Sequence, residues 1–386
     1  MDDVKALGAA FQVAVRLLVY DWIRFAATIF GVSIAVVLIL LQFGFLETLL
    51  NRASSTIEQF DANIWVVSHN VESIDLPVEF SDSLVWVARS TAGVQRADNL
   101  TLRYLNEVRK TGQRESVLIF AMRNFRPWRF PRFVDGSTDD LREGRVVLVD
   151  ASPSNLMRFG KVDKGDFTVL NETRAMVIAT SRQLFVFSAT PIALASENTL
   201  QQMTGSNLYQ GLTSFIVVKT DPKVDPRVVQ RSLRERLPRQ DVFLKDQWIN
   251  KTRMYWLLRT GLGLNMALNI GLGLLVGLAV VSLNLYVVTM EHFREFGTIK
   301  AIGGRDSDIH LIIVIQGLVY GLLSFAVGWT VCRLIGVALA RVDLAPNLSP
   351  LAVLAALSFC LGLCFVASLL SFRLIAGIDP IDVMRN

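Results

Sequence analysis

Apolar and polar stretches alternate along this chain over much greater lengths than in a soluble protein. Four runs, at residues 25–45, 261–290, 309–332 and 344–372, contain no Asp, Glu, Lys or Arg. An α-helix rises ~1.5 Å per residue, so about 20 apolar residues cross the hydrocarbon core of a bilayer. Each run is long enough to do so. The pattern predicts a polytopic α-helical membrane protein with four transmembrane helices.

The segment before the first run has the spacing of an amphipathic helix. Its apolar residues recur at intervals of three or four, at Val4, Leu7, Phe11, Val15, Leu18 and Trp22. Residues 1–24 are therefore predicted to form an interfacial helix in the lipid headgroup layer. Packing of the same helix on the protein's own cytoplasmic surface explains the spacing equally well, and both interpretations stay open.

The polar region between the first two runs, residues 47–258, is predicted to be a large α+β domain. Short runs of β-branched residues, typical of strands, recur at residues 63–68, 116–121, 145–150, 175–179 and 214–219. Asp225 and Pro226 indicate the start of a helix that ends near Leu237, because Pro is favoured at the first helical position. The domain is inserted between the first helix and the other three.

Basic residues set the expected topology. Lys5, Arg16 and Arg24 precede the first span, whereas only Arg52 follows it closely. Because Lys and Arg concentrate in cytoplasmic segments, both chain termini are expected in the cytoplasm. The predicted segments are a cytoplasmic amphipathic helix (1–24), transmembrane helix 1 (25–46), an extracytoplasmic α+β domain (47–258), transmembrane helix 2 (259–290), a cytoplasmic elbow (291–308), transmembrane helix 3 (309–333), a short extracytoplasmic loop (334–349), transmembrane helix 4 (350–372) and a cytoplasmic tail (373–386).

The charged elbow between the second and third runs has a helical pattern of its own. Phe293, Phe296, Ile299 and Ile302 form an apolar stripe, and Arg294, Glu295 and Lys300 fall away from it. Gly303 and Gly304 then end the helix. A short amphipathic helix of this kind can place its apolar edge against another protein while its charges fix the orientation.

A second unusual stretch, residues 122–133, alternates arginines with aromatic residues. Arg123, Arg126, Arg129 and Arg132 recur at every third position, with Trp128 among the intervening aromatics. The two prolines favour an extended conformation, in which this period places the arginines along one side. One interpretation is contact with an anionic or amphiphilic partner or with lipid. The other is a rigid loop whose aromatics pack on the domain while the arginines pair with local acids. Nucleic acid is not expected, because this region faces away from the cytoplasm.

Polar and small residues within the apolar runs indicate helix packing. Apart from Asn347, which precedes the predicted transmembrane helix 4, the only amide or imidazole side chains there are those of Gln42, Asn265, Asn269, Asn284, His310 and Gln316. The absence of carboxylates, Lys and Arg argues against an ion-coupled secondary transporter, and the asparagines are predicted to form interhelical hydrogen bonds. Two GxxxG pairs, Gly273 with Gly277 and Gly317 with Gly321, predict close helix packing or dimerisation.

The chain lacks the motifs that enzymes and metalloproteins use. It contains no G-x-x-x-x-G-K-[ST], H-E-x-x-H, C-x-x-C or G-x-S-x-G sequence. Its three histidines lie in three different segments, and its three cysteines all lie in apolar runs. We therefore expect a non-catalytic chain that binds no metal and no cofactor, and whose energy comes from another subunit.

The elbow sequence REFGTIKAIG, residues 294–303, closely resembles the signature between the second and third helices of FtsX/MacB-type ABC permeases. The tail IDPIDVMR, residues 378–385, resembles the C-terminal Asp-Pro motif of that family, and the layout of one helix, a large periplasmic insertion and three helices is also similar. The resemblance implies that the elbow is a coupling helix that docks on an ATPase. The coupling residues that it implies are Glu291, Arg294, Glu295, Phe296, Gly297, Ile299, Lys300 and Gly303.

The size and the opening of the insertion resemble the DevC-type permeases. That resemblance implies a homodimeric permease, a separate ATPase subunit that holds ATP and Mg, and a periplasmic adaptor (membrane fusion protein) leading to an outer-membrane channel. The chain would then lie in the bacterial inner membrane. Its expected function is that of the permease subunit of an ATP-driven export or mechanotransmission complex.

Two alternatives within the same family stay open. One is a lipoprotein-releasing permease. The other is an FtsX-like regulator that does not transport but activates a cell-wall hydrolase. A membrane enzyme is disfavoured, because the sequence contains no catalytic constellation.

Overall fold

The computed structural model describes residues 11–18, 20–108, 114–129, 133–135, 141, 146–150, 164–181, 187, 191–205, 211–292, 298, 306–340 and 345–376. The chain divides into two compact units. The helical unit comprises residues 1–47, 264–340 and 344–386. The β-rich unit comprises Thr48–Gly263 together with residues 341–343. Each unit is described by itself below.

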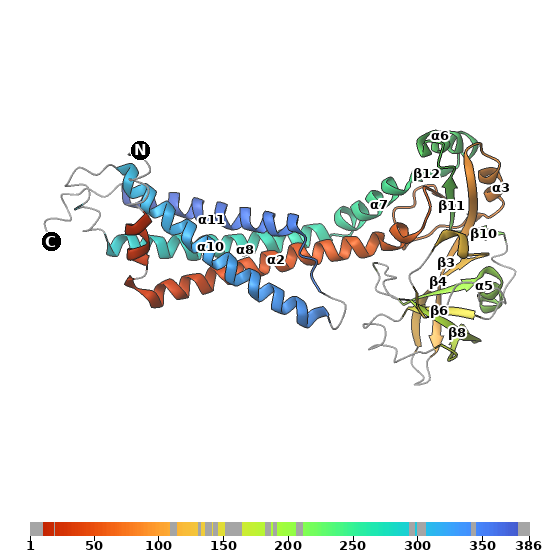
Figure 1. Ribbon diagram of the computed structural model, residues 1–386, viewed down its shortest axis with the longest axis horizontal. Coiled ribbons are helices and arrows are strands. Elements are labelled where there is room, and N and C mark those ends of the chain that lie inside the picture. The colour runs from red at the N-terminus through yellow and green to blue at the C-terminus, as the bar shows by residue number, and fades with distance from the viewer. Residues whose placement is uncertain are drawn as a thin grey trace. The chain divides into compact units, whose positions relative to one another are not determined.

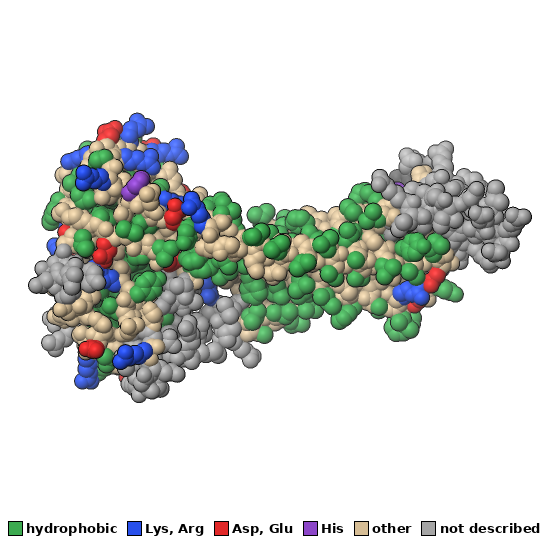
Figure 2. All heavy atoms as spheres, turned by 180° about the vertical axis from the view of Figure 1, so that it is seen from behind, with side chains coloured by type: hydrophobic (Ala, Val, Ile, Leu, Met, Phe, Trp, Pro, Cys, Tyr) green, Lys and Arg blue, Asp and Glu red, His purple; other side chains and the backbone are tan. Residues whose placement is uncertain are grey.

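The helical unit is built from four long apolar helices (Figure 1). They are α2 (Trp22–Gln59), α8 (Leu262–Glu291), α10 (Asp306–Leu339) and α11 (Pro350–Ala376). All four are long and apolar enough to cross a membrane, and Figure 2 shows hydrophobic side chains over the middle of this unit's surface. The predicted fold class, four apolar helices with a large α+β domain between the first and the second, is confirmed.

Helix α2 ends at Gln59, well past residue 46, where the apolar run predicted its end. The hydropathy signal stops because residues 47–59 mix apolar with polar side chains. The helix nevertheless continues, since Ala53 and Ile57 on this part are buried at 1% and 0% exposure within the β-rich unit. A one-sided apolar stripe is enough to stabilise a helix by packing.

Small residues and hydroxyl groups bring the four helices close together. Ser33 on α2 donates a hydrogen bond to the Ser324 carbonyl of α10 at 3.2 Å, and the Ser324 hydroxyl donates to the Ile29 carbonyl at 3.3 Å. A Cβ added at Gly328 of α10 would lie 2.8 Å from Val36 of α2. In a bilayer, close approach and interhelical hydrogen bonds replace the hydrophobic effect as the source of helix association.

The amphipathic segment that precedes α2 is helical where it is described, at residues 11–18. Ala14 is fully buried and packs in one cluster with Ile309, Ile312 and Ile313 of α10. Phe11, in contrast, remains 52% exposed. Of the two interpretations of this segment, packing on the protein's own helices therefore describes Ala14, while the exposed Phe11 remains available to the surroundings.

The β-rich unit contains a long twisted sheet with strand order β12-β1-β11-β3-β4-β9-β6-β8-β5, and β7 pairs with β3 and β8. A separate two-stranded sheet pairs β10 with β2. The strands are β1 (Ile64–Ser68), β2 (Phe80–Ser81), β3 (Val94–Val108), β4 (Arg114–Met122), β5 (Phe133–Asp135), β6 (Val146–Asp150), β7 (Phe167–Leu170), β8 (Thr173–Ser181), β9 (Ile192–Ser196), β10 (Leu212–Thr213), β11 (Phe215–Thr220) and β12 (Gln240–Leu244). The remaining helices are α3 (Leu84–Arg89), η1 (Arg126–Trp128), α5 (Glu197–Thr204), α6 (Pro226–Arg236), α7 (Lys245–Met254) and η4 (Tyr255–Arg259). All five segments that the sequence predicted as strands are strands.

The long strand β3 joins the two halves of the sheet. Its first half pairs with β11 and its second half pairs with β4, both antiparallel. Side chains alternate between the faces of a strand, and β1 accordingly places Ile64 and Val66 in one core and Trp65 and Val67 in another. The first of these cores also contains the buried edge of α6.

Helix α6 begins as the sequence predicts. The Asp225 carboxylate accepts a hydrogen bond from the backbone amide of Arg227 at 2.9 Å, and Pro226 occupies the first turn. A side-chain cap and a proline at this position satisfy or remove the amides that a helix start leaves unpaired. Val229 and Leu233 of this helix are both fully buried.

Candidate functional site

An ion pair joins the start of α2 to the end of α8. The Arg24 guanidinium contacts the Glu291 carboxylate, and it also pairs with Asp21 at 3.3 Å. Both partners of the longer-range pair remain partly exposed, at 39% for Arg24 and 49% for Glu291. Glu291 is the first of the expected coupling residues. The structure therefore ties the point where the elbow begins to the point where α2 begins.

Most of the expected coupling helix lies outside the described residues. This applies to Arg294, Glu295, Phe296, Gly297, Ile299, Lys300 and Gly303. Within the elbow the structure describes Glu291 and His292 at the end of α8, Thr298, which is helical, and residues 306–308, which begin α10. The coupling function of these residues thus stays a prediction from the sequence.

A partly enclosed cavity of about 560 Å³ lies beside this ion pair. Its charged and aromatic wall is formed by Arg16, Tyr20, Asp21, Arg24, Glu291 and His292. The Tyr20 ring meets the His292 ring edge-on, with centroids 5.9 Å apart. Leu18 and Phe25 supply apolar wall beneath the charged groups. The cavity is of the size of ordinary small-molecule sites, which occupy roughly 300–1,000 Å³.

From the sequence, Arg24 indicated only the topology, and its ion pair with Glu291 was not predicted. A signal for the pair was nevertheless present. Arg24 lies where the first apolar run begins, and Glu291 lies where the second run ends. The start of one span and the end of the next face the same side of a membrane, because the chain crosses the membrane twice between them. Opposite charges at such positions are candidates for an ion pair.

Polar side chains within the spans form hydrogen bonds both between helices and within one helix. The Asn284 amide of α8 donates to the Tyr320 hydroxyl of α10 at 2.9 Å, which is the interhelical hydrogen bond that the sequence predicted. Asn269 instead bonds to Asn265 on its own helix at 3.2 Å, so the same prediction is wrong for that pair. The reason is their spacing of four residues on an exposed helix face, where neighbouring turns meet.

Both GxxxG pairs face helices of the same chain. A Cβ at Gly277 of α8 would lie 3.2 Å from Ala35 of α2, and a Cβ at Gly321 of α10 would lie 3.1 Å from Cys364 of α11. Gly273 lies against α2 and Gly317 against α11 in the same way. These glycine faces therefore serve packing within the helical unit, and dimerisation through them stays a prediction.

The Arg-aromatic stretch turns at Arg126–Arg129, contrary to the extended conformation that was expected there. Arg126–Trp128 form a turn of 3-10 helix, and Arg129 follows with a left-handed backbone at φ 48°. Pro127 is compatible with this geometry because its fixed φ also suits the first turn of a helix. Arg132 lies outside the described residues, so the row of four arginines along one side stays a prediction.

The aromatic residues of this stretch pack into the domain. Phe125 and Trp128 are 2% and 1% exposed, and the Trp128 indole donates a hydrogen bond to Asp98 at 2.9 Å. Arg123 pairs with Glu197 at 3.3 Å while 79% of its side chain is exposed. These contacts are those of a rigid loop packed on the domain. Partner or lipid contact by the exposed arginines stays a prediction.

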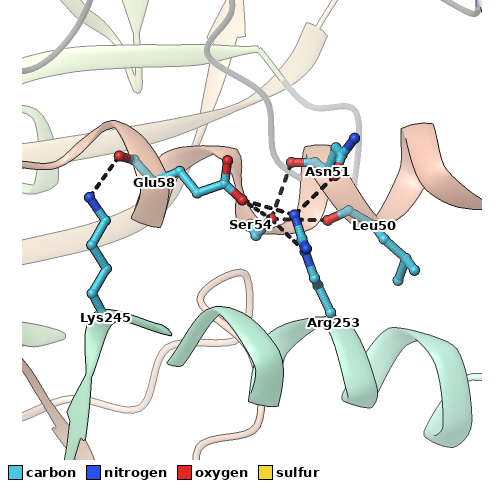
Figure 3. A network of polar contacts seen from close by, with 6 residues as sticks. All are labelled: Leu50, Asn51, Ser54, Glu58, Lys245 and Arg253. Atoms are coloured by element: carbon cyan, nitrogen blue, oxygen red, sulfur yellow. Dashed lines mark hydrogen bonds and ion pairs between the residues drawn. The ribbon is translucent and has the colours of Figure 1, made fainter. Parts of the chain in front are cut away.

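A polar network in the β-rich unit ties the last turns of α2 to α7 (Figure 3). The Arg253 guanidinium donates to Ser54 at 3.0 Å, to Asn51 at 2.9 Å and to Glu58 at 2.9 Å. The Lys245 ammonium donates to the Glu58 carbonyl at 2.8 Å, and burial lowers the pKa of this ammonium. The sequence did not predict this network, because its donors and acceptors lie between 187 and 202 positions apart.

Asp75 is a buried carboxyl group in the same unit. It is 2% exposed, and burial raises its pKa from 3.8 to about 6 despite hydrogen bonds from the Phe187 backbone, Trp256 and Ser73. The Trp256 indole donates to Ser73 at 3.1 Å and stacks on the Phe187 ring at 3.6 Å. Within the described residues, no group of His, Cys, Asp and Glu side chains is arranged to hold a metal ion.

Comparison with known protein families identifies the chain. The family described as MacB-like periplasmic core domain matches residues 25–236, and the family described as FtsX-like permease C-terminal matches residues 268–380. This chain is an FtsX/MacB-like ABC permease. The match to the second family includes the whole elbow and the first three residues of the tail motif, residues 378–380. Among curated proteins, none matches the sequence of this permease.

Two of the solved structures that are similar to the permease are isolated domains. The periplasmic region of MacB from Actinobacillus actinomycetemcomitans is 14% identical, with a TM-score of 0.39, and the match covers 48% of this chain and 90% of that one. The extracellular domain of the ABC-type transporter YknZ from Gram-positive bacteria is 13% identical, with a TM-score of 0.35, and the match covers 47% of this chain and 98% of that one.

Proposed function

We propose that this permease is the membrane subunit of an ATP-driven export or mechanotransmission complex, in which a separate ATPase subunit supplies the energy. Membership of the FtsX/MacB-like family supports the coarse assignment. The finer proposal is that ATPase movements reach the β-rich unit through the helices, without a substrate path between them. The observation that carries it is the attachment of the elbow's first residue, Glu291, to Arg24 at the start of α2.

The chemistry of the spans supports mechanical coupling. Several polar groups described there bond to neighbouring helices, as in the bonds from Asn284 to Tyr320 and from Ser33 to Ser324. A path for ions or protons would instead require ionisable groups facing a hydrated interior. A connected set of packed helices is suited to transmitting a displacement from an ATPase.

The same proposal includes the partners. The permease would act as a homodimer with an ATPase dimer that binds ATP and Mg, and with a periplasmic adaptor leading to an outer-membrane channel, as the DevC-type resemblance implies. It would lie in the bacterial inner membrane with both termini in the cytoplasm and the β-rich unit in the periplasm. The distribution of Lys and Arg around the spans supports this orientation.

The experiment is purification of the tagged permease from its own membranes in a mild detergent, with identification of each co-purifying subunit. An ATPase together with an adaptor is the expected result. An ATPase without an adaptor would instead favour lipoprotein release or hydrolase regulation. Absence of any ATPase under several gentle conditions would contradict the proposal.

The elbow is tested in the same preparation. Phe296→Asp, which places a charge on the apolar stripe, and Gly297→Trp, which obstructs close backbone contact, are each expected to abolish assembly with the ATPase. The control is Phe296→Leu, which keeps the apolar contact and should retain assembly. Normal stimulated ATP turnover by the Asp and Trp variants would exclude the coupling function of the elbow.

A further inference from the structure

The cavity beside Arg24 has a charge pattern that the proposed function does not use. Its wall carries two arginines, Arg16 and Arg24, and two carboxylates, Asp21 and Glu291. Arg24 pairs with both carboxylates. Arg16 is exposed and makes no ion pair with any residue in the described part of the chain. The wall therefore combines an unpaired cation with carboxylates that keep exposed edges, and its formal charge is balanced.

A balanced wall of this kind is complementary to a zwitterion. A purely anionic ligand would gain from Arg16 but would be repelled by Asp21 and Glu291. A ligand with a phosphate and a primary ammonium can place the phosphate at Arg16 and donate hydrogen bonds from the ammonium to a carboxylate. Both carboxylate side chains retain the accessibility that this requires, at 45% exposure for Asp21 and 49% for Glu291. Charge-assisted hydrogen bonds of both kinds are roughly twice as strong as neutral ones.

Exposed aromatic residues place the cavity at the depth of lipid headgroups. Tyr20 is 83% exposed, Trp22 is 68% exposed, and Phe11 on the preceding segment is 52% exposed. Tyr and Trp concentrate where membrane spans meet the headgroup layer, because their rings are apolar and their tips are polar. The charged groups of the cavity lie at the ends of apolar spans, which is the same level.

An apolar track leads from the cavity along α2. Ile23, Phe30, Ile34 and Leu38 are between 45% and 68% exposed, and their spacing places them along one side of the helix. Arg24, which lines the cavity, directly follows the first of them. A headgroup in the cavity would thus have an apolar surface beneath it for its acyl chains. This favours a membrane lipid over a free zwitterion of the same chemistry.

We propose that this cavity binds the headgroup of a phospholipid that carries a primary amine, of the phosphatidylethanolamine type. Arg16 contacts the phosphate, and Glu291 accepts a hydrogen bond from the ammonium. The acyl chains lie along the exposed side of α2. The lipid then bridges the amphipathic segment at residues 11–18 and the end of α8, next to the elbow.

The test uses the full-length permease in a non-ionic detergent, with equal amounts of phosphatidylethanolamine, phosphatidylglycerol and phosphatidylcholine that have identical acyl chains. Native mass spectrometry measures which lipids the protein retains. The wild type is expected to retain phosphatidylethanolamine in preference to both others, because a trimethylammonium group cannot donate to Glu291 and phosphatidylglycerol lacks the amine. Equal retention of the three, or preferred retention of phosphatidylglycerol, would overturn the proposal.

Two variants separate recognition from folding. Glu291→Gln keeps an acceptor for Arg24 but removes a negative charge, so the preference should change from phosphatidylethanolamine to phosphatidylglycerol. Arg16→Gln should lower retention of phosphatidylethanolamine by roughly fivefold, the effect of one cation near a membrane surface. Arg333→Gln removes an exposed arginine of α10 that lies over Trp329 and outside the cavity, and should change nothing.

A final competition distinguishes the lipid from a soluble ligand. Excess phosphoethanolamine, which has the headgroup but no acyl chains, should fail to displace the retained lipid if the chains contact α2. Displacement by this soluble compound would overturn the assignment to a membrane lipid. An unchanged preference in the Glu291→Gln variant would likewise contradict the proposed contact with the ammonium.

Discussion

Arg24 and Glu291 are separated by 267 positions in the sequence, yet they form an ion pair between the first turn of α2 and the last turn of α8. The two helices also approach closely within the helical unit. A Cβ built at Gly273 of α8 would lie 3.7 Å from the Ile39 side chain of α2. The ion pair thus holds the start of α2 to the end of α8, and the apolar surfaces of these two helices are already in contact. It also positions the residue at which the elbow begins.

We expect the ion pair between Arg24 and Glu291 to make a modest contribution to the stability of the folded protein. Arg24→Gln, Glu291→Gln and the double variant form a cycle in which the two single changes together should destabilise more than the double variant does. The coupling should be small, because both side chains are partly exposed and solvent screens their charges. Thermal unfolding of the detergent-solubilised protein measures it. Strictly additive effects would show that the pair contributes nothing.

The Arg253 network predicts a larger effect in the β-rich unit. Arg253→Ala removes three hydrogen bonds that join α7 to Asn51, Ser54 and Glu58. We expect a loss of roughly 1–3 kcal/mol, because the bond to Glu58 is charge-assisted and Ser54 is fully buried.

Two further variants show whether geometry matters at this site. Arg253→Lys should rescue little, because an ammonium cannot reproduce the planar fork that reaches three acceptors. Arg259→Ala, which removes an exposed arginine of the following turn, is the control and should have little effect. Full stability of the Arg253→Ala variant in thermal unfolding would exclude the network as a structural element.

The glycine of α10 nearest to α11 should not tolerate a methyl group. A Cβ at Gly317 would lie 2.3 Å from the Ser368 hydroxyl and 3.0 Å from the Cys364 carbonyl. Ser368 can rotate only by giving up its 2.8 Å hydrogen bond to that carbonyl, and the carbonyl itself belongs to the backbone. Gly317→Ala should therefore destabilise the protein by about 1–3 kcal/mol.

Gly271→Ala is the matched control for this prediction. No atom lies within 4 Å of a Cβ built at Gly271, and alanine favours a helix over glycine by about 1 kcal/mol. That variant should be neutral or slightly more stable. A comparison of the two melting temperatures in one detergent decides the question, and equal effects of the two changes would contradict close packing at Gly317.

Asp75 predicts a pH dependence of stability. Its folded pKa of about 6 lies above the unfolded value of 3.8, so the folded state binds the proton more tightly. The stabilisation is fully present below pH 3.8 and is lost as the pH rises to about 6. At neutral pH the ionised carboxylate costs roughly 2–3 kcal/mol, at about 1.4 kcal/mol per pKa unit.

Asp75→Asn should therefore stabilise the protein at neutral pH and flatten the pH profile between about pH 4 and pH 6. Fluorescence-detected unfolding is a suitable measurement, because Trp256 stacks on Phe187 next to this carboxyl group. Glu235→Gln, at an exposed position of α6, is the control and should leave the profile unchanged. A wild-type profile that is already flat over this range would contradict the raised pKa.

The sequence by itself determined the elements whose signals are local. The four uncharged runs became four apolar helices, because each is long enough to satisfy its own backbone and too apolar for water. Asp225 and Pro226 determined the start of α6, since the cap and the proline act within one turn. The five β-branched runs became strands, because the preference of β-branched residues for an extended backbone is also local. The elbow motif likewise identified the family that the comparisons show.

The tertiary structure decided what depends on distant partners. Helix α2 continues to Gln59 because Ile57 packs in the β-rich unit, which hydropathy along the chain does not register. The turn at Arg126–Trp128 overrides the extended conformation expected at Pro127, because Trp128 is buried and bonded to Asp98. The pairing of Arg24 with Glu291 required two helices to meet. Hydrophobicity and capping act over a few residues, whereas such pairings are set only when the whole chain is packed.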